Sequence, residues 1–283
     1  MLSMRTNAAS LSAQNALSRA AQANAKSGTR LSTGYRVNSA MDDAAGLQIA
    51  TRLAAQTSGM AVAMRNIQNG ISLMQVADTV AGSLIDIFSR MHDLAIQAAD
   101  GSSTQTDKEA LQGEFAELFD QAWRVLSTTY NGESLFVNTG AVGSDKFMQP
   151  LKFQIGDSSD DVMTADLSRA LIQTLPSFKY GDSDLVDILT AHASDAIADM
   201  SSAIDSWAAL RSAAGAVANT LEHASNNVAN MLANTQAATG RIMDTDYAME
   251  VATSSTAQML MQSSTSMLKQ ASSAIQLTLS LIS

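Results

Sequence analysis

Cysteine is absent from this chain of 283 residues, which excludes disulfide bonds, thiolate metal sites and cysteine nucleophiles. Proline occurs only at Pro150 and Pro176, and aromatic residues make up 5% of the sequence. The apolar content is mostly alanine, leucine, methionine, isoleucine and valine, and several of these residues lose little freedom in a helix. The composition therefore favours long helices, with an interruption near the middle of the chain.

Several function classes lack their sequence signals. The net charge of −10 offers no basic surface for nucleic acid, so no nucleic-acid partner is expected. The N-terminus lacks the apolar core of a secretory signal peptide, and no apolar run approaches bilayer-spanning length, which predicts no membrane insertion. His92, His192 and His223 stand far apart and none belongs to HExxH, while GxSxG and Gly-rich phosphate motifs are missing. We expect neither an enzyme nor a resident cofactor or metal.

A heptad pattern dominates residues 57–99. Apolar residues recur there in alternating four- and three-residue steps, with one irregular slot near Ala77 and Asp78. A seam held over about five heptads is typical of coiled-coil packing. Its residues are Met60, Met64, Ile67, Ile71, Met74, Ala81, Ile85, Phe88, His92 and Ala95.

Further elements follow along the chain. Thr106 with Glu109 fits a capping box that would open a helix ending before Tyr130. LKFQIG and DDVMTADL, separated by an acidic turn, predict a β-hairpin. Helical periodicity returns from about Asp184, and a final helix is expected from about Asp246.

The plan is nearly symmetric about the centre of the chain. It predicts a mainly α fold, in which both chain ends form a long antiparallel coiled-coil-like helical rod around a small central β-hairpin region. The expected domains are 1–40 with 241–283 as a terminal helical domain, 41–136 with 184–240 as a helical rod domain, and 137–183 as the hairpin and a short variable region.

The terminal helices carry almost no charge. Arg19 is the only charged residue from Thr6 to Ala25, and Lys269 is the only one from Val251 to Ser283. A solvated helix normally carries charge on its outer face, so other helices are expected to cover these faces. The alternative is a pair of disordered tails, and the interpretation that joins both is a pair of segments that are disordered alone and helical when packed. Acids at the start of the last helix could meet the basic residues that precede Asp42.

Residues 30–53 form the segment between the first two helices and contain the pair Asp42-Asp43. These carboxylates could begin a metal site, form an acid/base pair, or belong to a structural joint. The joint is favoured, with the acids capping the next helix or meeting Arg30, Arg36 or Arg52. Its candidate residues are Gly34, Arg36, Asn38, Asp42, Asp43 and Gly46.

Five segments in order resemble the signatures of one family. LSTGYRVNSAMDDAAG, RNIQNGISLMQVAD, MHDLAIQAADGSSTQTDKEALQGEF, FQIG and RIMDTDYAMEVATSSTAQMLMQSSTSML are similar to segments of bacterial flagellins, and the matches cover residues 1–136 and 150–283. The resemblance implies a filament subunit for swimming or swarming motility that is exported unfolded by the flagellar type III apparatus into the extracellular flagellum. Its short insert implies little or no outer domain.

The resemblance also implies partners and surfaces. The partners are copies of the same chain, the flagellar cap, the hook–filament junction proteins and an export chaperone on the C-terminal region. SRMHDLAIQ resembles the surface that a host Toll-like receptor contacts, with Arg90, Leu94, Gln97 and Glu114 matching and with His92 and Asp93 departing. These residues would also serve inter-subunit packing. The expected polymerisation core comprises Leu11, Leu17, Leu260, Leu268, Ile275, Leu279 and Ile282.

Two other hypotheses compete with the filament subunit. A hook–filament junction protein shares the helical ends but forms a limited adaptor ring. SAMDDAAG, QIATRL and RIMDTDYAME look more like flagellin than like the junction protein. A soluble enzyme is disfavoured because the sequence has no catalytic constellation.

Overall fold

The structure, a computed structural model, describes residues 7–136, 145–174 and 187–280, with side chains described as far as residue 274. The chain forms two compact units. Unit 1 combines Met1–Thr57 with Ala233–Ser283, and unit 2 is Ser58–Leu232. These divisions fall within two long helices, α2 (Ala44–Ala99) and α6 (Ala193–Met243), rather than at the expected domain boundaries near residues 40 and 240.

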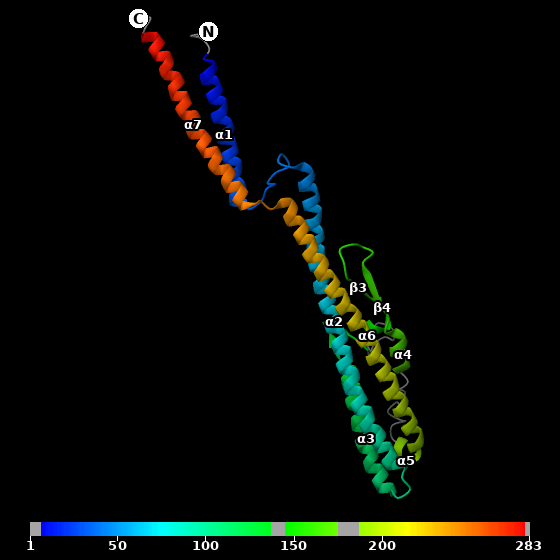
Figure 1. Cartoon of the computed structure of the whole chain (residues 1–283). Coiled ribbons are helices and arrows are strands. Elements are labelled where there is room, and N and C mark those ends of the chain that lie inside the picture. The colour runs from blue at the N-terminus through cyan, green and yellow to red at the C-terminus, as the bar shows by residue number, and fades with distance from the viewer. Residues whose placement is uncertain (1–6, 137–144, 175–186, 281–283) are drawn as a thin grey trace. The chain divides into compact units, whose positions relative to one another are not determined.

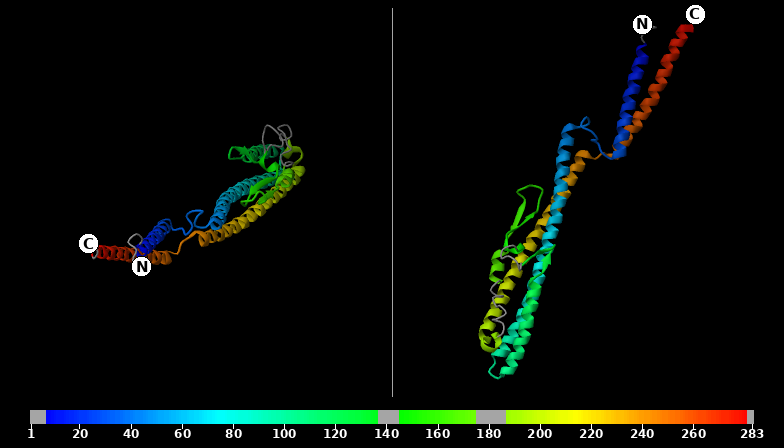
Figure 2. Two further views of the ribbon diagram at one scale, coloured as in Figure 1. Left: turned by 90° about the horizontal axis from the view of Figure 1, so that it is seen from above. Right: turned by 180° about the vertical axis from the view of Figure 1, so that it is seen from behind.

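Unit 1 is built on two antiparallel helices, α1 (Ala8–Thr33) and α7 (Tyr247–Ser280). The two helices lie side by side (Figures 1 and 2). Asn7 caps α1 by accepting a hydrogen bond from the Ser10 backbone N–H at 3.2 Å. Gly34 ends α1 in the left-handed conformation, with φ 76°, and its N–H donates to the Arg30 carbonyl at 2.9 Å. The sequence thus sets both ends of α1 through local backbone chemistry.

Unit 2 packs α2, α6 and α3 (Gln105–Leu126) around one apolar core (Figure 1). Smaller helices complete it: η1 (Lys146–Met148), α4 (Ser168–Thr174) and α5 (Ile188–Ala191). The predicted heptad seam is confirmed, because its members are buried in this core or packed against it, with His92 half-buried. At the irregular slot Ala77 is buried, while Asp78 accepts a hydrogen bond from Arg211 Nε at 2.7 Å.

The central hairpin is also confirmed. β3 (Leu151–Gln154) pairs antiparallel with β4 (Val162–Ala165). The hairpin packs on α2 where Gly70 has no side chain. A Cβ at Gly70 would lie 3.0 Å from the Phe153 ring and 3.1 Å from Leu221. A side chain at residue 70 would therefore push the hairpin or α6 away from α2.

A second, shorter hairpin was not predicted. β1 (Thr129–Tyr130) and β2 (Glu133–Ser134) are joined by Asn131 and Gly132, which have φ values of 54° and 82°. Positive φ at both central residues is the geometry of a tight hairpin turn that favours Asn-Gly. The Asn131-Gly132 dipeptide was the sequence signal for this turn, and it predicts a β-hairpin in addition to the end of the preceding helix.

The predicted capping box of α3 is wrong, because the box lies two residues earlier in the chain. Thr104, not Thr106, is the N-cap, and its hydroxyl accepts from the Asp107 backbone N–H at 3.2 Å. Asp107 in turn accepts from the Thr104 N–H at 3.0 Å, and the Thr104 hydroxyl holds the pKa of Asp107 below its usual value. Aspartate thus fills the place that glutamate was expected to fill at Glu109.

Substitution Thr104→Ala is expected to lower the free energy of unfolding by about 1 kcal/mol, because it leaves an N-terminal amide of α3 without its acceptor. Thr106→Ala is the matched control. Thr106 is exposed within the first turn of α3, where alanine is the better helix former, so no loss is expected. Urea denaturation followed by circular dichroism measures both variants; equal losses would contradict the assignment of the cap.

The prediction that no apolar run approaches bilayer-spanning length is wrong for helix α2. Helix α2 contains a stretch that is long and apolar enough, by length and composition alone, to cross a membrane. Its apolar residues have a simpler explanation, because Ile67, Met74 and Ala81 are buried in the core of unit 2. Core helices of folded domains commonly pass the same test. The absence of membrane insertion stays a prediction.

The mainly α fold with long helices packed against each other and a small β region is confirmed. Within unit 1 the two chain ends supply the antiparallel partners α1 and α7. Within unit 2, α2 and α6 come from opposite sides of the hairpin region and share one core. Unit 1 therefore joins the two ends of the chain, and unit 2 joins segments from the two sides of the hairpin region.

Candidate functional site

The interface between α1 and α7 is made of small side chains. Ala13, Ala20 and Ser27 of α1 are buried, as are Ala257 and Ser264 of α7. Small residues let two helices approach closely, but each buries little apolar surface. The pair is therefore close-packed and gains little free energy from burial within one chain.

Polar contacts set the register of this pair. Glu250 is buried and accepts a hydrogen bond from Ser27 Oγ at 2.6 Å, and Arg30 Nη1 lies 3.5 Å from its second carboxylate oxygen. Further along, Ser254 Oγ donates to Asn24 Oδ1 at 3.0 Å. A buried carboxylate without its partners is costly, so a shifted register is disfavoured. The expectation that acids of the last helix meet the basic arm is confirmed for Glu250.

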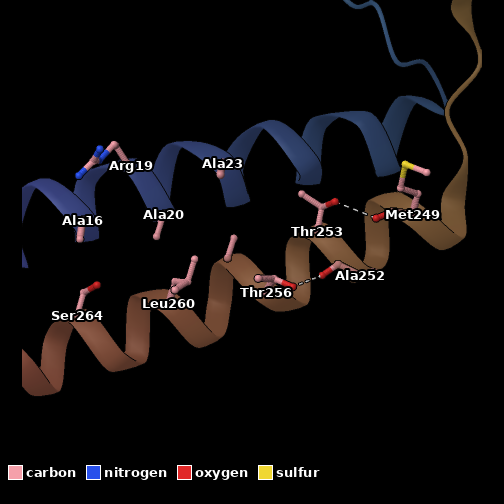
Figure 3. A pocket seen from close by; sticks show the side chains of 11 residues that line it. Ala16, Arg19, Ala20, Ala23, Met249, Ala252, Thr253, Thr256, Leu260 and Ser264 are labelled. Atoms are coloured by element: carbon pink, nitrogen blue, oxygen red, sulfur yellow. Dashed lines mark hydrogen bonds between the residues drawn. The ribbon is translucent and has the colours of Figure 1, made fainter.

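A groove of about 640 Å³ runs along one side of the pair (Figure 3). Ala16, Ala20 and Ala23 project from α1 and Leu260 projects from α7 toward the space between the helices. Thr256 also lines the groove, and its hydroxyl donates to the Ala252 carbonyl at 2.8 Å. Because that hydroxyl is satisfied within its own helix, the groove is predominantly apolar.

Large apolar side chains are exposed mainly in unit 1, although unit 2 is the larger unit. Unit 1 exposes Leu11, Tyr35, Met41, Ile49, Tyr247, Met249, Val251, Met259, Leu260 and Met267. Unit 2 exposes Val62, Ile96, Val162, Ile172 and Met231. Exposed large apolar side chains in this number favour contacts of unit 1 with another molecule.

The predicted polymerisation residues fall partly on this surface. Leu11 is 60% exposed and Leu260 is 53% exposed, while Leu17 and Leu268 are half-buried. The side chains of Ile275 and Leu279 and the whole of Ile282 lie outside the described residues. The structure thus leaves Leu11 and Leu260 available for contacts with another molecule.

The joint between α1 and α2 is a loop, residues 34–43, that pairs with the connection between α6 and α7. The Arg36 N–H donates to the Met243 carbonyl at 2.6 Å, and the Thr245 N–H donates to the Gly34 carbonyl at 2.9 Å. Arg36 Nη2 adds a hydrogen bond to the Ile242 carbonyl at 2.8 Å. The two connections therefore form one structured element.

Asp42 is the polar centre of this joint loop. It accepts backbone hydrogen bonds from Asn38 and Ser39 at 3.3 and 3.2 Å, and Lys26 Nζ lies 2.7 Å away. The hydrogen bond from Lys26 lowers the pKa of Asp42 to about 2. Asn38 also donates from its side chain to the Tyr35 carbonyl at 2.8 Å. Asp42 thus folds the loop back onto α1.

Asp43 has a separate role. Its Oδ1 accepts from the Gly46 backbone N–H at 2.8 Å, which caps the start of α2, and Arg36 Nη2 lies 3.8 Å from its other oxygen. A side chain at Gly46 would collide with the Asp43 carboxylate. The interpretation as a joint accounts for the contacts of both aspartates. Across the described ranges, no group of three or more histidine and acidic residues could hold a metal ion.

Lys26 is the joint residue that the sequence did not indicate. The expected cations were arginines, and Arg36 does approach Asp43, but Arg30 points to Glu250. Lys26 and Asp42 meet only because the loop reverses its direction after Gly34. No periodic pattern in the sequence encodes that reversal.

The predicted receptor and inter-subunit surface lies on α2 and α3 and is only partly a surface. Arg90 donates two hydrogen bonds to one oxygen of Glu114, from Nε to Oε1 at 3.0 Å and from Nη2 to Oε1 at 2.6 Å, and Gln97 is exposed. Leu94, by contrast, is 1% exposed and belongs to the core of unit 2. Its assignment to the surface is wrong, because it faces the helices that pack on α2.

Family models for bacterial flagellin match both ends of the chain. The model of the N-terminal helical region matches residues 4–141, and the model of the C-terminal helical region matches residues 197–282. Polar flagellin A of Vibrio parahaemolyticus is 29% identical, with 99% of each chain covered. The flagellin of Halalkalibacterium halodurans is 34% identical, with 89% of each chain covered.

Solved structures add a likeness in fold. A flagellar hook-associated protein from Vibrio parahaemolyticus superposes with a TM-score of 0.56 over 72% of this chain and all of its own, at 14% identity. At that identity the likeness shows the fold alone. The two family models, by contrast, together match well over half of the sequence, in the two regions that form the long helices. The chain therefore belongs to the bacterial flagellin family and is a structural subunit of the flagellar filament.

Proposed function

We propose that this subunit polymerises through the α1–α7 pair, which forms the core of the filament. The observation that carries this proposal is the concentration of exposed apolar side chains in unit 1. The pair itself is nearly uncharged, so burying it against other copies removes few charges from water. Leu11 and Leu260 would gain the burial that one chain does not give them.

The other parts of the chain have their own proposed roles. Residues 41–136 and 184–240 form the rod domain, and 137–183 supply the hairpin with a short variable region. An alignment of 373 positions with the polar flagellin A of Vibrio parahaemolyticus exceeds the 283 residues of this chain, so that relative carries segments absent here. A subunit with so short an insert is expected to build a thin, smooth filament.

The subunit reaches the extracellular filament by export in an unfolded state through the flagellar type III apparatus. A chain without cysteine forms no disulfide that would obstruct threading. The export chaperone holds the C-terminal region, where α7 exposes Met259, Leu260 and Met267 before assembly. The cap and the hook–filament junction proteins are the partners at the two ends of the filament.

A host Toll-like receptor is a further partner of this family, and the surface available to it here consists of Arg90, Gln97 and Glu114. Arg90 and Glu114 bind each other on the exposed side of α2 and α3. In the assembled filament, the same residues would contact neighbouring subunits. Receptor binding and packing would then compete for one surface.

Seeded growth tests the proposed function. Purified chain added to short filament fragments is expected to extend them into long filaments visible by electron microscopy. A chain that adds only a limited ring to the fragment ends, as a junction protein would, overturns the proposal. Monomer incubated without seeds serves as the control for spontaneous aggregation.

A further inference from the structure

Met41 has an unusual position for a large apolar residue. It is 95% exposed, more than any other large apolar side chain in the described residues. Its loop is nevertheless fixed, because the neighbouring Asp42 accepts hydrogen bonds from Asn38 and Ser39 and pairs with Lys26. The next residue, Asp43, caps α2. Met41 is therefore a single apolar side chain presented to solvent by an ordered loop.

Such an arrangement favours binding. The hydrogen bonds of the loop already limit its conformations, so docking Met41 would order little additional chain. A methionine side chain is unbranched and adapts to an irregular pocket, and its burial is favourable. The loop thus has the properties of a preformed projection that lacks a receiving site.

A suitable receiving site lies on the same unit. A groove of about 490 Å³ is lined by the first turns of α2 and the last turns of α6. Its small residues, Ala50, Ala54 and Gly240, leave room for an inserted side chain, and Leu47 and Met243 add apolar walls. Met41 does not fill the groove of its own chain, because it is almost fully exposed.

We propose that Met41 of one subunit enters the groove lined by Ala50, Ala54 and Gly240 of a second copy. The inference rests on the proposed polymerisation through unit 1 and identifies one of its contacts. A projection and a groove at different places on one unit allow a heterologous contact, in which each copy docks on the next, and such a contact repeats into an open helical polymer when the rotation does not close into a ring. The groove begins next to the joint loop, since Tyr35 and Asp244 also line it, so the projection and the groove both lie in unit 1.

The other groove of unit 1 is a poorer match. It lies between α1 and α7, and each groove has one charged residue in its lining, Arg19 in this one and Asp244 in the groove at the first turns of α2. It runs along the helix pair from Met249 to Ser264, which suits the side of another helix more than one projecting side chain.

The absence of cysteine provides a direct test. Two full-length single-cysteine variants, Met41→Cys and Ala54→Cys, are mixed, assembled on wild-type seeds and treated with diamide, which oxidises two thiols to one disulfide. A covalent heterodimer, identified by the mass of the cross-linked peptides, is expected in filaments and not in the unassembled mixture. Each variant assembled alone is the control for disulfides between identical positions.

Chemical protection and substitution give independent readouts. The Met41→Cys thiol is expected to react with a maleimide at least about tenfold more slowly in filaments than in monomers. Met41→Leu should elongate seeds at the wild-type rate, and Met41→Asp at least about tenfold more slowly. Filaments that form without the heterodimer and without protection overturn this inference and leave polymerisation intact. Failure of the wild-type chain to elongate would instead reject the proposed function itself.

Discussion

Removal of residues 257–283 is expected to abolish filament elongation while unit 2 remains folded. The deletion takes away Ala257 and Ser264, which are buried against α1, and it removes the exposed Leu260 and Met267. α1 then lacks most of its antiparallel partner, and an isolated helix of small and polar residues is marginal in water. The truncated subunit would lack both the α1–α7 pair and the exposed apolar side chains through which we propose that it contacts other subunits.

Two measurements check this expectation. Seeded growth of the truncated chain is followed by electron microscopy, and thermal unfolding is followed by far-ultraviolet circular dichroism. The transition of unit 2 should persist, because its core lies within Ser58–Leu232 and contains no residue of α7. The full-length variant Val162→Ala, on the hairpin of unit 2, should elongate normally. Filaments grown from the truncated chain would remove α7 from the polymerisation core.

Leu94→Asp is expected to destabilise unit 2 by about 4 kcal/mol or more. Leu94 is 1% exposed, so the substitution opens a cavity and places a carboxylate in an apolar core. Since a typical domain is stable by only about 5–15 kcal/mol, much of unit 2 would lose its tertiary packing. Urea denaturation measured by circular dichroism gives the free energy of unfolding.

Ile96→Asp is the matched control, because Ile96 lies two residues further along α2 and is 49% exposed. Its expected loss is about 0.5 kcal/mol or less. A Leu94→Asp chain as stable as Ile96→Asp would show that Leu94 does not lie in the core. The comparison also governs receptor assays, since a response lost in Leu94→Asp would reflect unfolding. Arg90→Ala, on the exposed pair with Glu114, is the substitution that probes the surface.

The sequence by itself determined the long helices and the central hairpin. The seam from Met60 to Ala95 follows from heptad spacing, since apolar residues at that spacing are buried only as a helix against other helices. The first helix was expected to end near residue 29, and it continues to Thr33, where Gly34 ends it in a left-handed conformation that glycine adopts at little cost. The hairpin of β3 and β4 follows from alternation in a proline-containing region between helical patterns. These features depend on local backbone preferences and on one-dimensional periodicity.

Only the tertiary structure decided which side of a helix faces a partner and which charges meet. Leu94 and Arg90 lie one turn apart on α2, yet Leu94 is buried in the core of unit 2 and Arg90 is exposed. Asp42 pairs with Lys26 because the joint loop reverses direction after α1. Arg30 pairs with Glu250 because α7 packs antiparallel to α1. The sequence pattern predicted Thr106 as the N-cap, and the position where α3 begins makes Thr104 the N-cap. Such contacts depend on distances between elements, and those distances are set by packing that no local pattern records.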